Sequence, residues 1–372
     1  MRLMPRRRAI LLAPLAASIG AVNTNAETLS EEAIHAILAR RIDVGHQSTG
    51  IIAVVSDKAG NRLVTYGRPD TPDNKPLDGK TVFEIGSITK VLTALLLSDM
   101  VTHREVAFGD PVAEYLPTSV RMPDYKGKAI TLVDLATYTS GLPPMPDNII
   151  SKDPFNPFAD YTIDQLYSFL SRYALKHEPG TYVEYSNVGF ALLGHVLARR
   201  ANKSYENLLI ERICGPLGLD DTRITLTPDM RSRIAQGHNA NLERRPLWDL
   251  PTLAGAGAVR STANDLTVFL EACLGRRPTP FGPALAKLLE IRRQIGRPAS
   301  EHAVEVGLGW FISRGYGDEI VWKDGGSGGF SAFIGFSPNV GQGCIVLSNA
   351  ANWHYLDDIG MHLINSDFPL LK

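Results

Sequence analysis

Strand-like segments lie near both ends of this chain, and a long, mainly helical stretch separates them. Near the N-terminus, an expected helix is followed by two strand-like runs around a turn, at Ser30 to Arg41, Gly50 to Val55 and Arg62 to Tyr66. Near the C-terminus, three more strand candidates precede a closing helix, at Glu319 to Lys323, Ser331 to Phe336, Gly343 to Ser348 and Tyr355 to Ile364. Such strands bury their apolar faces best in one sheet. We therefore expect an antiparallel sheet formed from both chain ends, with a large, mainly helical insertion.

The middle of the chain carries apolar residues at three- and four-residue spacing, which is typical of helices. The expected helices are Thr89 to His103, Thr131 to Tyr138, Thr162 to Tyr173, Val188 to Ala201, Ser204 to Ile213 and Ala263 to Leu274. With 372 residues, 44% of them hydrophobic, the chain is long enough to bury a large core. We expect one domain over residues 27–372, with a sheet subregion at about 27–80 and 303–372 and a helical subregion at about 81–302.

The first residues differ in character from the rest. The start is basic, with Arg2 and Arg6 to Arg8, and is followed by an apolar, small-rich run from Ala9 to Val22. Thr24-Asn25-Ala26 resembles a small-x-small cleavage site, so we interpret residues 1–26 as a secretory signal peptide and expect a periplasmic protein. The alternative is an anchor that stays attached, although the apolar run is shorter than the ~20 residues of a membrane span. No later segment suggests a stable membrane span.

Charge is balanced along the chain. Lys plus Arg number 38 against 39 for Asp plus Glu, which gives a net charge of -1. This balance gives no electrostatic reason to bind nucleic acid, so we expect a small-molecule substrate and no nucleic-acid partner. We also expect a monomer. The basic run Arg231 to Arg233 is expected to be solvated.

Cysteine and histidine spacing indicates no metal site. Cys214, Cys273 and Cys344 are scattered without ligand spacing, and we expect them to be small buried side chains. One disulfide is compatible with an oxidising compartment, but the sequence names no pair. The isolated histidines form no ligand pair, and they are His238, His302 and His354.

The sharpest local pattern is Phe83-Glu84-Ile85-Gly86-Ser87-Ile88-Thr89-Lys90, which ends an extended segment and opens an apolar helix. Ser87 and Lys90 are three residues apart and therefore share one helix face, where the amine can approach the hydroxyl. A serine hydroxyl needs an adjacent base and a positive field to attack a carbonyl, and a desolvated lysine supplies one or both. Taken alone, the pair is also compatible with a helix cap and a solvated lysine.

A second element is Tyr185-Ser186-Asn187, just before an expected helix. A tyrosine between cationic groups can have its phenol pKa lowered, so Tyr185 could take the proton of Ser87 and pass it to a leaving nitrogen. Asn187 could hydrogen-bond a substrate amide. The alternative is a tyrosine packed beside a helix that Ser186 or Asn187 caps.

A third element is a strand that runs through Lys323, Asp324, Gly325 and Gly326 into a glycine-dense turn. Glycines let a substrate backbone lie close to the strand, and the Gly326 N–H could join that of Ser87 as an oxyanion donor. Lys323 would add positive potential near Ser87. The same stretch is also compatible with a flexible glycine hairpin.

The order Ser-x-x-Lys, Tyr-x-Asn and Lys-x-Gly resembles class C β-lactamases and the related D-alanyl-D-alanine peptidases and esterases. The likeness covers nearly the whole mature chain, with further similar segments at residues 135–143 and 345–349. It implies an α/β (α+β) sandwich and an acyl-enzyme mechanism without metal or organic cofactor. It also implies that Ser87 is acylated, that Lys90 and Tyr185 handle protons, that Asn187 orients the substrate and that Lys323 contacts its end.

Two departures from that pattern concern the substrate. Asp324 stands where the family usually has a hydroxyl residue that binds a substrate carboxylate, and Met145 lies in the segment where class C enzymes place a glutamine. A class C-like β-lactamase is the leading interpretation, and a D-alanyl-D-alanine carboxypeptidase or endopeptidase is the nearest alternative. A short-chain esterase and a catalytically silent penicillin-binding sensor are the others. Asp324 favours the esterase, because an ester need carry no carboxylate.

Overall fold

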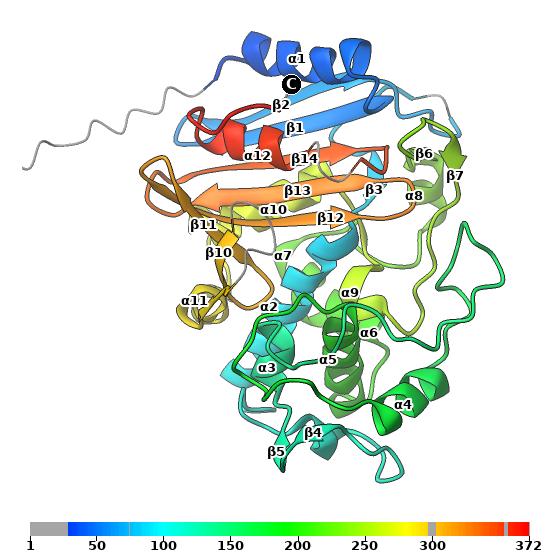
Figure 1. The fold of residues 1–372 in the computed structure, drawn as a ribbon. Helices are drawn as coiled ribbons and strands as arrows, with labels where there is room; N and C mark the ends of the chain where they lie inside the picture. Colours follow the sequence, from blue (N-terminus) through cyan, green and yellow to red (C-terminus); the bar gives the residue numbers. More distant parts are fainter. Residues whose placement is uncertain (1–28, 74, 297–302, 353–355, 372) are drawn as a thin grey trace, which may run out of the picture.

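The computed structural model describes residues 29–73, 75–296, 303–352 and 356–371. Its largest element is a sheet of eight antiparallel strands in the order β2-β1-β14-β13-β12-β11-β10-β9 (Figure 1). These strands are β1 (Gly50–Asp57), β2 (Gly60–Gly67), β9 (Arg293–Gln294), β10 (Ala303–Val306), β11 (Phe311–Gly315), β12 (Asp318–Gly326), β13 (Ser331–Ser337) and β14 (Gln342–Ser348). The N-terminal strand β1 pairs with the C-terminal strand β14, with Ile51 opposite Ser348. The expected sheet from both chain ends is therefore confirmed.

The central strands are buried on both faces. Every residue of β13 and β14 is buried, and in β1 only Asp57 is partly exposed. Near-continuous apolar runs of this kind require cover on both sides of the sheet. Helix α12 (Asp357–Ile364) packs on β13 and β14 in front of the sheet in Figure 1, and α10 (Ala263–Cys273) packs on the same strands from behind.

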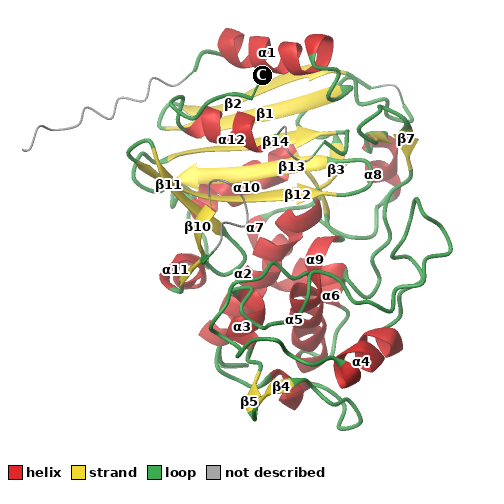
Figure 2. Ribbon diagram, in the orientation of Figure 1, coloured by secondary structure: helices red, strands yellow, loops and turns green. Residues whose placement is uncertain are grey.

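The remaining helices lie mostly to one side of this sheet, below it in Figure 2. They are α2 (Thr89–Thr102), α3 (Leu132–Ala136), α4 (Ile163–Arg172), α5 (Asn187–Arg200), α6 (Tyr205–Leu209), α7 (Gly215–Leu217), α8 (Pro228–Arg233), α9 (Ala254–Gly257) and α11 (Gly282–Glu290), while α1 (Glu31–Ala39) covers β2 at the other end. Helix α2 is buried from Thr89 to Met100 and contacts α5, α9 and α11. It therefore forms the centre of the helical subregion, and the expected α/β sandwich class is confirmed.

Some elements of the structure were not expected from the sequence. The short strands β9, β10 and β11 extend the sheet, and β9 lies within the range expected to be helical. Elsewhere, short strands form three two-stranded pairs, β3 (Val82–Glu84) with β8 (Arg260–Thr262), β4 (Asp124–Tyr125) with β5 (Lys128–Ala129) and β6 (Gly237–His238) with β7 (Arg244–Arg245). Strands of two to five residues are too short to show a recognisable alternation, so only their pairing partners define them.

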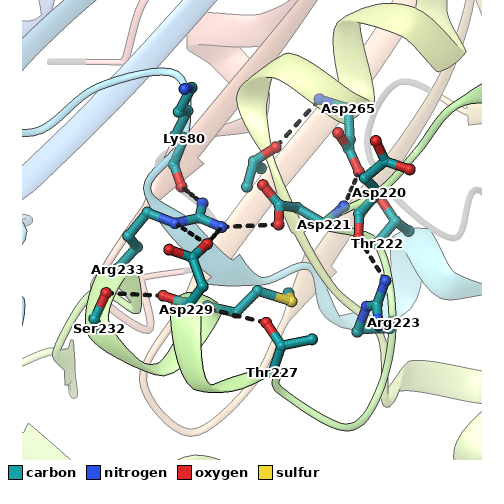
Figure 3. Close-up of polar contacts among 12 residues, drawn as sticks. Lys80, Asp220, Asp221, Thr222, Arg223, Thr227, Asp229, Ser232, Arg233 and Asp265 are labelled. Carbon is teal, nitrogen blue, oxygen red and sulfur yellow. Dashed lines mark hydrogen bonds and ion pairs between the residues drawn. The ribbon is translucent and has the colours of Figure 1, made fainter.

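A cluster of charged and polar side chains joins α8 and α10 to the segment between α7 and α8 (Figure 3). Arg233 is ion-paired with Asp221 at 2.8 Å and with Asp229 at 2.5 Å, and its side chain is only 12% exposed. The expectation that Arg231 to Arg233 is solvated is therefore wrong for Arg233. Asp265 accepts hydrogen bonds from Asp221 N and Thr222 Oγ1, both at 2.8 Å, and burial raises its pKa to about 6.

Candidate active site

Ser87 lies in a short 3-10 turn, Gly86–Ile88, between β3 and the start of α2. Gly86 has a φ of 48°, and a Cβ added there would lie 2.4 Å from the backbone N of Gly326. Only glycine combines this backbone conformation with such close approach. The turn therefore places Ser87 directly against the end of β12.

Lys90 is fully buried one helical turn beyond Ser87. Its Nζ donates hydrogen bonds to Ser87 Oγ at 2.8 Å, to Asn187 Oδ1 at 2.8 Å and to the carbonyl O of Ala256 at 2.7 Å. The expectation of an amine in reach of the hydroxyl matches this geometry. Burial, and in second place the positive charge of Lys323, hold the pKa of Lys90 well below its usual value.

Tyr185 completes the contacts of the serine hydroxyl. Its Oη lies 2.5 Å from Ser87 Oγ, and its ring stacks on that of Tyr138 with centroids 5.2 Å apart. Lys90 Nζ and Lys323 Nζ lie 4.8 Å and 5.3 Å from the Tyr185 ring centroid. Despite these cations, burial and then the charge of Asp324 raise the pKa of the phenol, so the expected lowering is wrong. Tyr185 is a neutral hydrogen-bonding phenol here.

Asn187 is the first residue of α5, whose N-cap is Ser186. Its Oδ1 receives the hydrogen bond from Lys90, and its Nδ2 donates to Met145 Sδ at 3.4 Å. Asn187 therefore holds the amine of Lys90 in place, in addition to lining the cavity. A thioether is a weak acceptor, so this Nδ2 is only weakly held and remains suited to a substrate carbonyl.

The end of β12 supplies the backbone opposite Ser87. A Cβ on Gly325 would lie 2.1 Å from Ile85 O and 3.0 Å from Ser87 N, so glycine is required at this crossing. Ser327 N–H donates to Phe330 O at 3.0 Å, which makes Gly326 and Ser331 a pair that exchanges no ladder bonds. The N–H of Gly326 therefore points away from β13, on the side of the cavity that Gly326 lines.

Lys323 and Asp324 form an ion pair at 2.7 Å. The Lys323 side chain is 1% exposed and packs over the Phe311 ring, with Nζ 4.4 Å from its centroid, whereas Asp324 is 37% exposed and lines the cavity. Lys323 therefore lies behind Asp324, and the group that faces a ligand there is the carboxylate.

One cavity of about 1050 Å³ is lined by five of these residues, namely Ser87, Tyr185, Asn187, Asp324 and Gly326. Its wall contains aromatic and apolar side chains that the sequence reasoning missed, namely Phe158, Trp248, Leu250, Leu253, Phe311, Trp322, Met361 and Phe368. It also missed Asp357 and Asp358, at the start of α12. No spacing pattern marks these positions, because they come together only through the fold.

The other sequence expectations have definite outcomes. Cys214 and Cys344 are buried and Cys273 is partly buried, and all three are free. Buried His238 contacts the Asn349 carbonyl, whereas His302, His354 and the signal segment 1–26 lie outside the described residues. Across the described ranges, no His, Cys, Asp or Glu group could hold a metal ion. None of the helices within those ranges is long and apolar enough to span a bilayer.

Comparison with known proteins agrees with this site. The family model described as Beta-lactamase matches residues 32–363, and the chain therefore belongs to the beta-lactamase family of serine hydrolases. It is 31% identical over 320 residues to the D-alanyl-D-alanine-carboxypeptidase/endopeptidase AmpH of Escherichia coli, covering 83% of this chain and 81% of that one. It is 26% identical over 323 residues to a beta-lactamase of Yersinia enterocolitica, covering 77% and 79%.

Solved structures show the same fold. A beta-lactamase/D-alanine carboxypeptidase from Yersinia pestis superimposes with a TM-score of 0.78 and 26% identity, over 90% of this chain and 98% of that one. A class C beta-lactamase from Rhodobacter sphaeroides gives a TM-score of 0.76 at 24% identity, over 90% and 99%. The resemblance of the three sequence motifs to this family is thus confirmed. The names of the relatives include both beta-lactamases and D-alanyl-D-alanine peptidases.

Proposed function

We propose that this chain hydrolyses D-alanyl peptides through an acyl-enzyme at Ser87, with Lys90 as general base. The observation that carries the proposal is the fully buried Lys90 amine at 2.8 Å from Ser87 Oγ. A nucleophile and base in hydrogen-bond contact, with the base oriented by further groups, are the requirements for covalent catalysis. Asn187 Oδ1 and Ala256 O are those further groups.

The partners of Lys90 fit a neutral amine. Asn187 Oδ1 and the Ala256 carbonyl can only accept, so they take the two N–H groups that a neutral amine has. In this neutral form the 2.8 Å contact with Ser87 has the opposite direction from that of an ammonium group, and the Ser87 O–H donates to the nitrogen lone pair. As Ser87 Oγ attacks the substrate carbonyl carbon, its proton moves to Lys90 Nζ, and the carbonyl oxygen becomes an oxyanion.

Two backbone N–H groups would stabilise that oxyanion. Ser87 N lies at the start of the turn before α2, and Gly326 N–H points away from β13 beside it. Hydrogen bonds from donors that are fixed before the reaction become stronger as negative charge develops on the carbonyl oxygen. This supports the expected role of Gly326 and gives Gly325 the separate task of letting β12 approach.

Tyr185 completes the proton transfer. Its neutral O–H, 2.5 Å from Ser87 Oγ, would protonate the leaving nitrogen. The proton held by Lys90 would then move to the Tyr185 oxygen and restore the phenol. The C–N bond then breaks, the amine leaves and an ester to Ser87 remains. A water molecule would attack this ester by the same steps in reverse, which releases the acid and restores Ser87.

The peptide substrate rests on similarity, since the AmpH match spans most of both chains. Hydrolysis of the β-lactam amide, as in a class C-like β-lactamase, is the second candidate, because relatives at 24% to 28% identity carry the name beta-lactamase. Both reactions use the same acyl-enzyme and differ in the acyl group and in how fast water removes it. We also propose export to the periplasm after cleavage near Ala26, which N-terminal sequencing of the exported protein tests.

One experiment separates the candidates. The mature protein is mixed with a penicillin and followed by intact mass over time, while release of D-alanine from a D-alanyl-D-alanine peptide is measured in parallel. Lasting acylation together with D-alanine release supports a peptidase, and transient acylation with fast penicillin turnover supports a β-lactamase. Absence of both acylation and D-alanine release would contradict the proposed function.

A further inference from the structure

Three carboxyl groups of the cavity wall lie close enough to interact electrostatically, and we call this part of the wall the carboxylate end. Asp324 comes from β12, and Asp357 and Asp358 are the first two residues of α12, which packs on β12 to β14. All three line the same cavity as Ser87. The family resemblance led us to expect a site for a substrate carboxylate here, and these side chains have the opposite charge from such a site.

The available cations at this end are already paired. Lys323 forms its ion pair with Asp324, and Arg41 forms one with Asp358 Oδ2. No basic partner of Asp357 exists among the described residues within ion-pairing distance. One carboxyl group is thus left over after the charges are matched.

Two oxygen atoms at this end lack hydrogen-bond donors. Asp357 Oδ1 and Asp358 Oδ1 are both shielded from solvent, and neither accepts a hydrogen bond from any residue that the structure describes. Buried acceptors are nearly always satisfied, because leaving one unpaired costs about 1 to 3 kcal/mol. Neighbouring orphaned acceptors beside a cavity therefore indicate a donor that arrives with the ligand.

We propose that this end of the cavity binds a protonated amine of the substrate, held by Asp357 with Asp358 and Asp324 around it. The inference rests on the proposed function in that it concerns the substrate of the same site. An ammonium group brings three N–H donors and one positive charge, which matches the orphaned oxygens and the unpaired carboxyl. A bare metal ion fits less well, since the described carboxylates form no metal-holding group.

The electrostatics of the empty site agree with this assignment. Burial, followed by the charge of Asp324, raises the pKa of Asp357 well above its usual value, while Lys323 acts in the other direction and Asp358 adds to the increase. The positive charge of Lys323 does not offset burial and the two neighbouring carboxylates, so the ionised form of Asp357 is disfavoured. A bound ammonium group would supply that charge and favour the ionised carboxylate.

The test uses binding to the Ser87→Ala protein, which keeps the cavity but cannot turn the ligand over. Two pairs of peptides are titrated by calorimetry, each pair consisting of a free amine and its acetylated form. One pair carries the amine before the scissile bond, as in Nα-acetyl-L-lysyl-D-alanyl-D-alanine, and the other carries it after that bond, as in N-acetyl-D-alanyl-D-lysine. We expect about tenfold tighter binding of the free amine in at least one pair.

The same titrations are repeated after adding Asp357→Asn, and with Asp164→Asn as a control that removes one charge from an exposed position on α4. Loss of the amine preference with Asp357→Asn but not with Asp164→Asn supports the proposal. Equal affinity for amine and acetylated forms in both pairs, or no binding of any peptide, overturns it. D-alanine release by the unmutated protein tests the proposed function separately, because it requires Ser87 but does not require a preference for the free amine.

Discussion

The two ends of the cavity differ in how completely their polar atoms are paired. At the Ser87 end, the Lys90 amine has three hydrogen-bond partners within 2.8 Å, and the hydroxyl of Ser87 also contacts Tyr185. At the other end, Asp357 Oδ1 accepts no hydrogen bond within the described part of the chain. A reacting group must be in place before the substrate arrives, whereas a recognition group can be completed by the substrate.

This difference makes the two ends separable by experiment. Substitutions at the Ser87 end should change the rate for every substrate by similar factors, because they alter bond making and breaking. Substitutions at the carboxylate end should change the choice between substrates and leave acylation by a good substrate largely intact. The substitutions below are ordered by the expected size of their effect on the rate, from the Ser87 end to the carboxylate end.

Replacing Ser87 by Ala should have the largest effect. We expect Ser87→Ala to abolish hydrolysis and acylation while the protein stays folded, because the change removes the nucleophile and little packing. Intact mass after exposure to a penicillin and thermal unfolding measure the two parts of this statement. Turnover above the solvent rate in the variant would remove Ser87 from the mechanism.

Lys90→Ala should lower the acylation rate by about a thousandfold, through loss of the base. Because burial lowers the pKa of Lys90, the base form should persist at neutral pH in the unmutated protein, and activity should fall on acidification as the amine gains a proton. Stopped-flow acylation across pH measures both effects. A Lys90→Ala variant that keeps the rate and the pH profile would show that another group is the base.

Tyr185→Phe should have a smaller effect, about a hundredfold, because it removes one hydrogen bond and the proton donor while keeping the packed ring. Because the pKa of the phenol is raised, Tyr185 should stay protonated below about pH 10. We therefore expect no increase in rate from its ionisation in that range. Comparing the pH profiles of the two proteins tests this. A rise near neutral pH that disappears in Tyr185→Phe would mean that a phenolate acts as base.

Sequence reasoning reached most of the Ser87 end. Ser87 and Lys90 are close in sequence, and a spacing of three on a helix brings their side chains together whatever surrounds the helix. Glycines at 325 and 326 likewise signal close backbone approach before the approaching segment is known. Local geometry was sufficient for these residues.

The other end was out of reach for physical reasons. Asp357 joins Asp324 only because β12, β13 and β14 pair in register and α12 then folds back onto them. The neutral state of Tyr185 likewise depends on burial, which outweighs two nearby cations that the sequence had suggested would dominate. Long-range packing decides both features, and no spacing along the chain encodes it.

Replacing Asp324 by Thr should have the smallest effect, and its sign depends on the substrate. The Asp324 carboxylate faces the cavity and neutralises Lys323, so removing it leaves an unopposed buried ammonium. Substrates with a carboxylate near this end should then gain roughly 1 kcal/mol, about a fivefold increase in kcat/KM, because a repulsion is lost and a neutral hydrogen bond is added at a partly exposed position. Neutral esters should change by much less, and they serve as the internal control. The quantity to compare is the ratio of kcat/KM for a carboxylate substrate and a neutral ester in both proteins. An unchanged ratio would mean that Asp324 does not act on the ligand and that the contrast between the two ends rests on Asp357 alone.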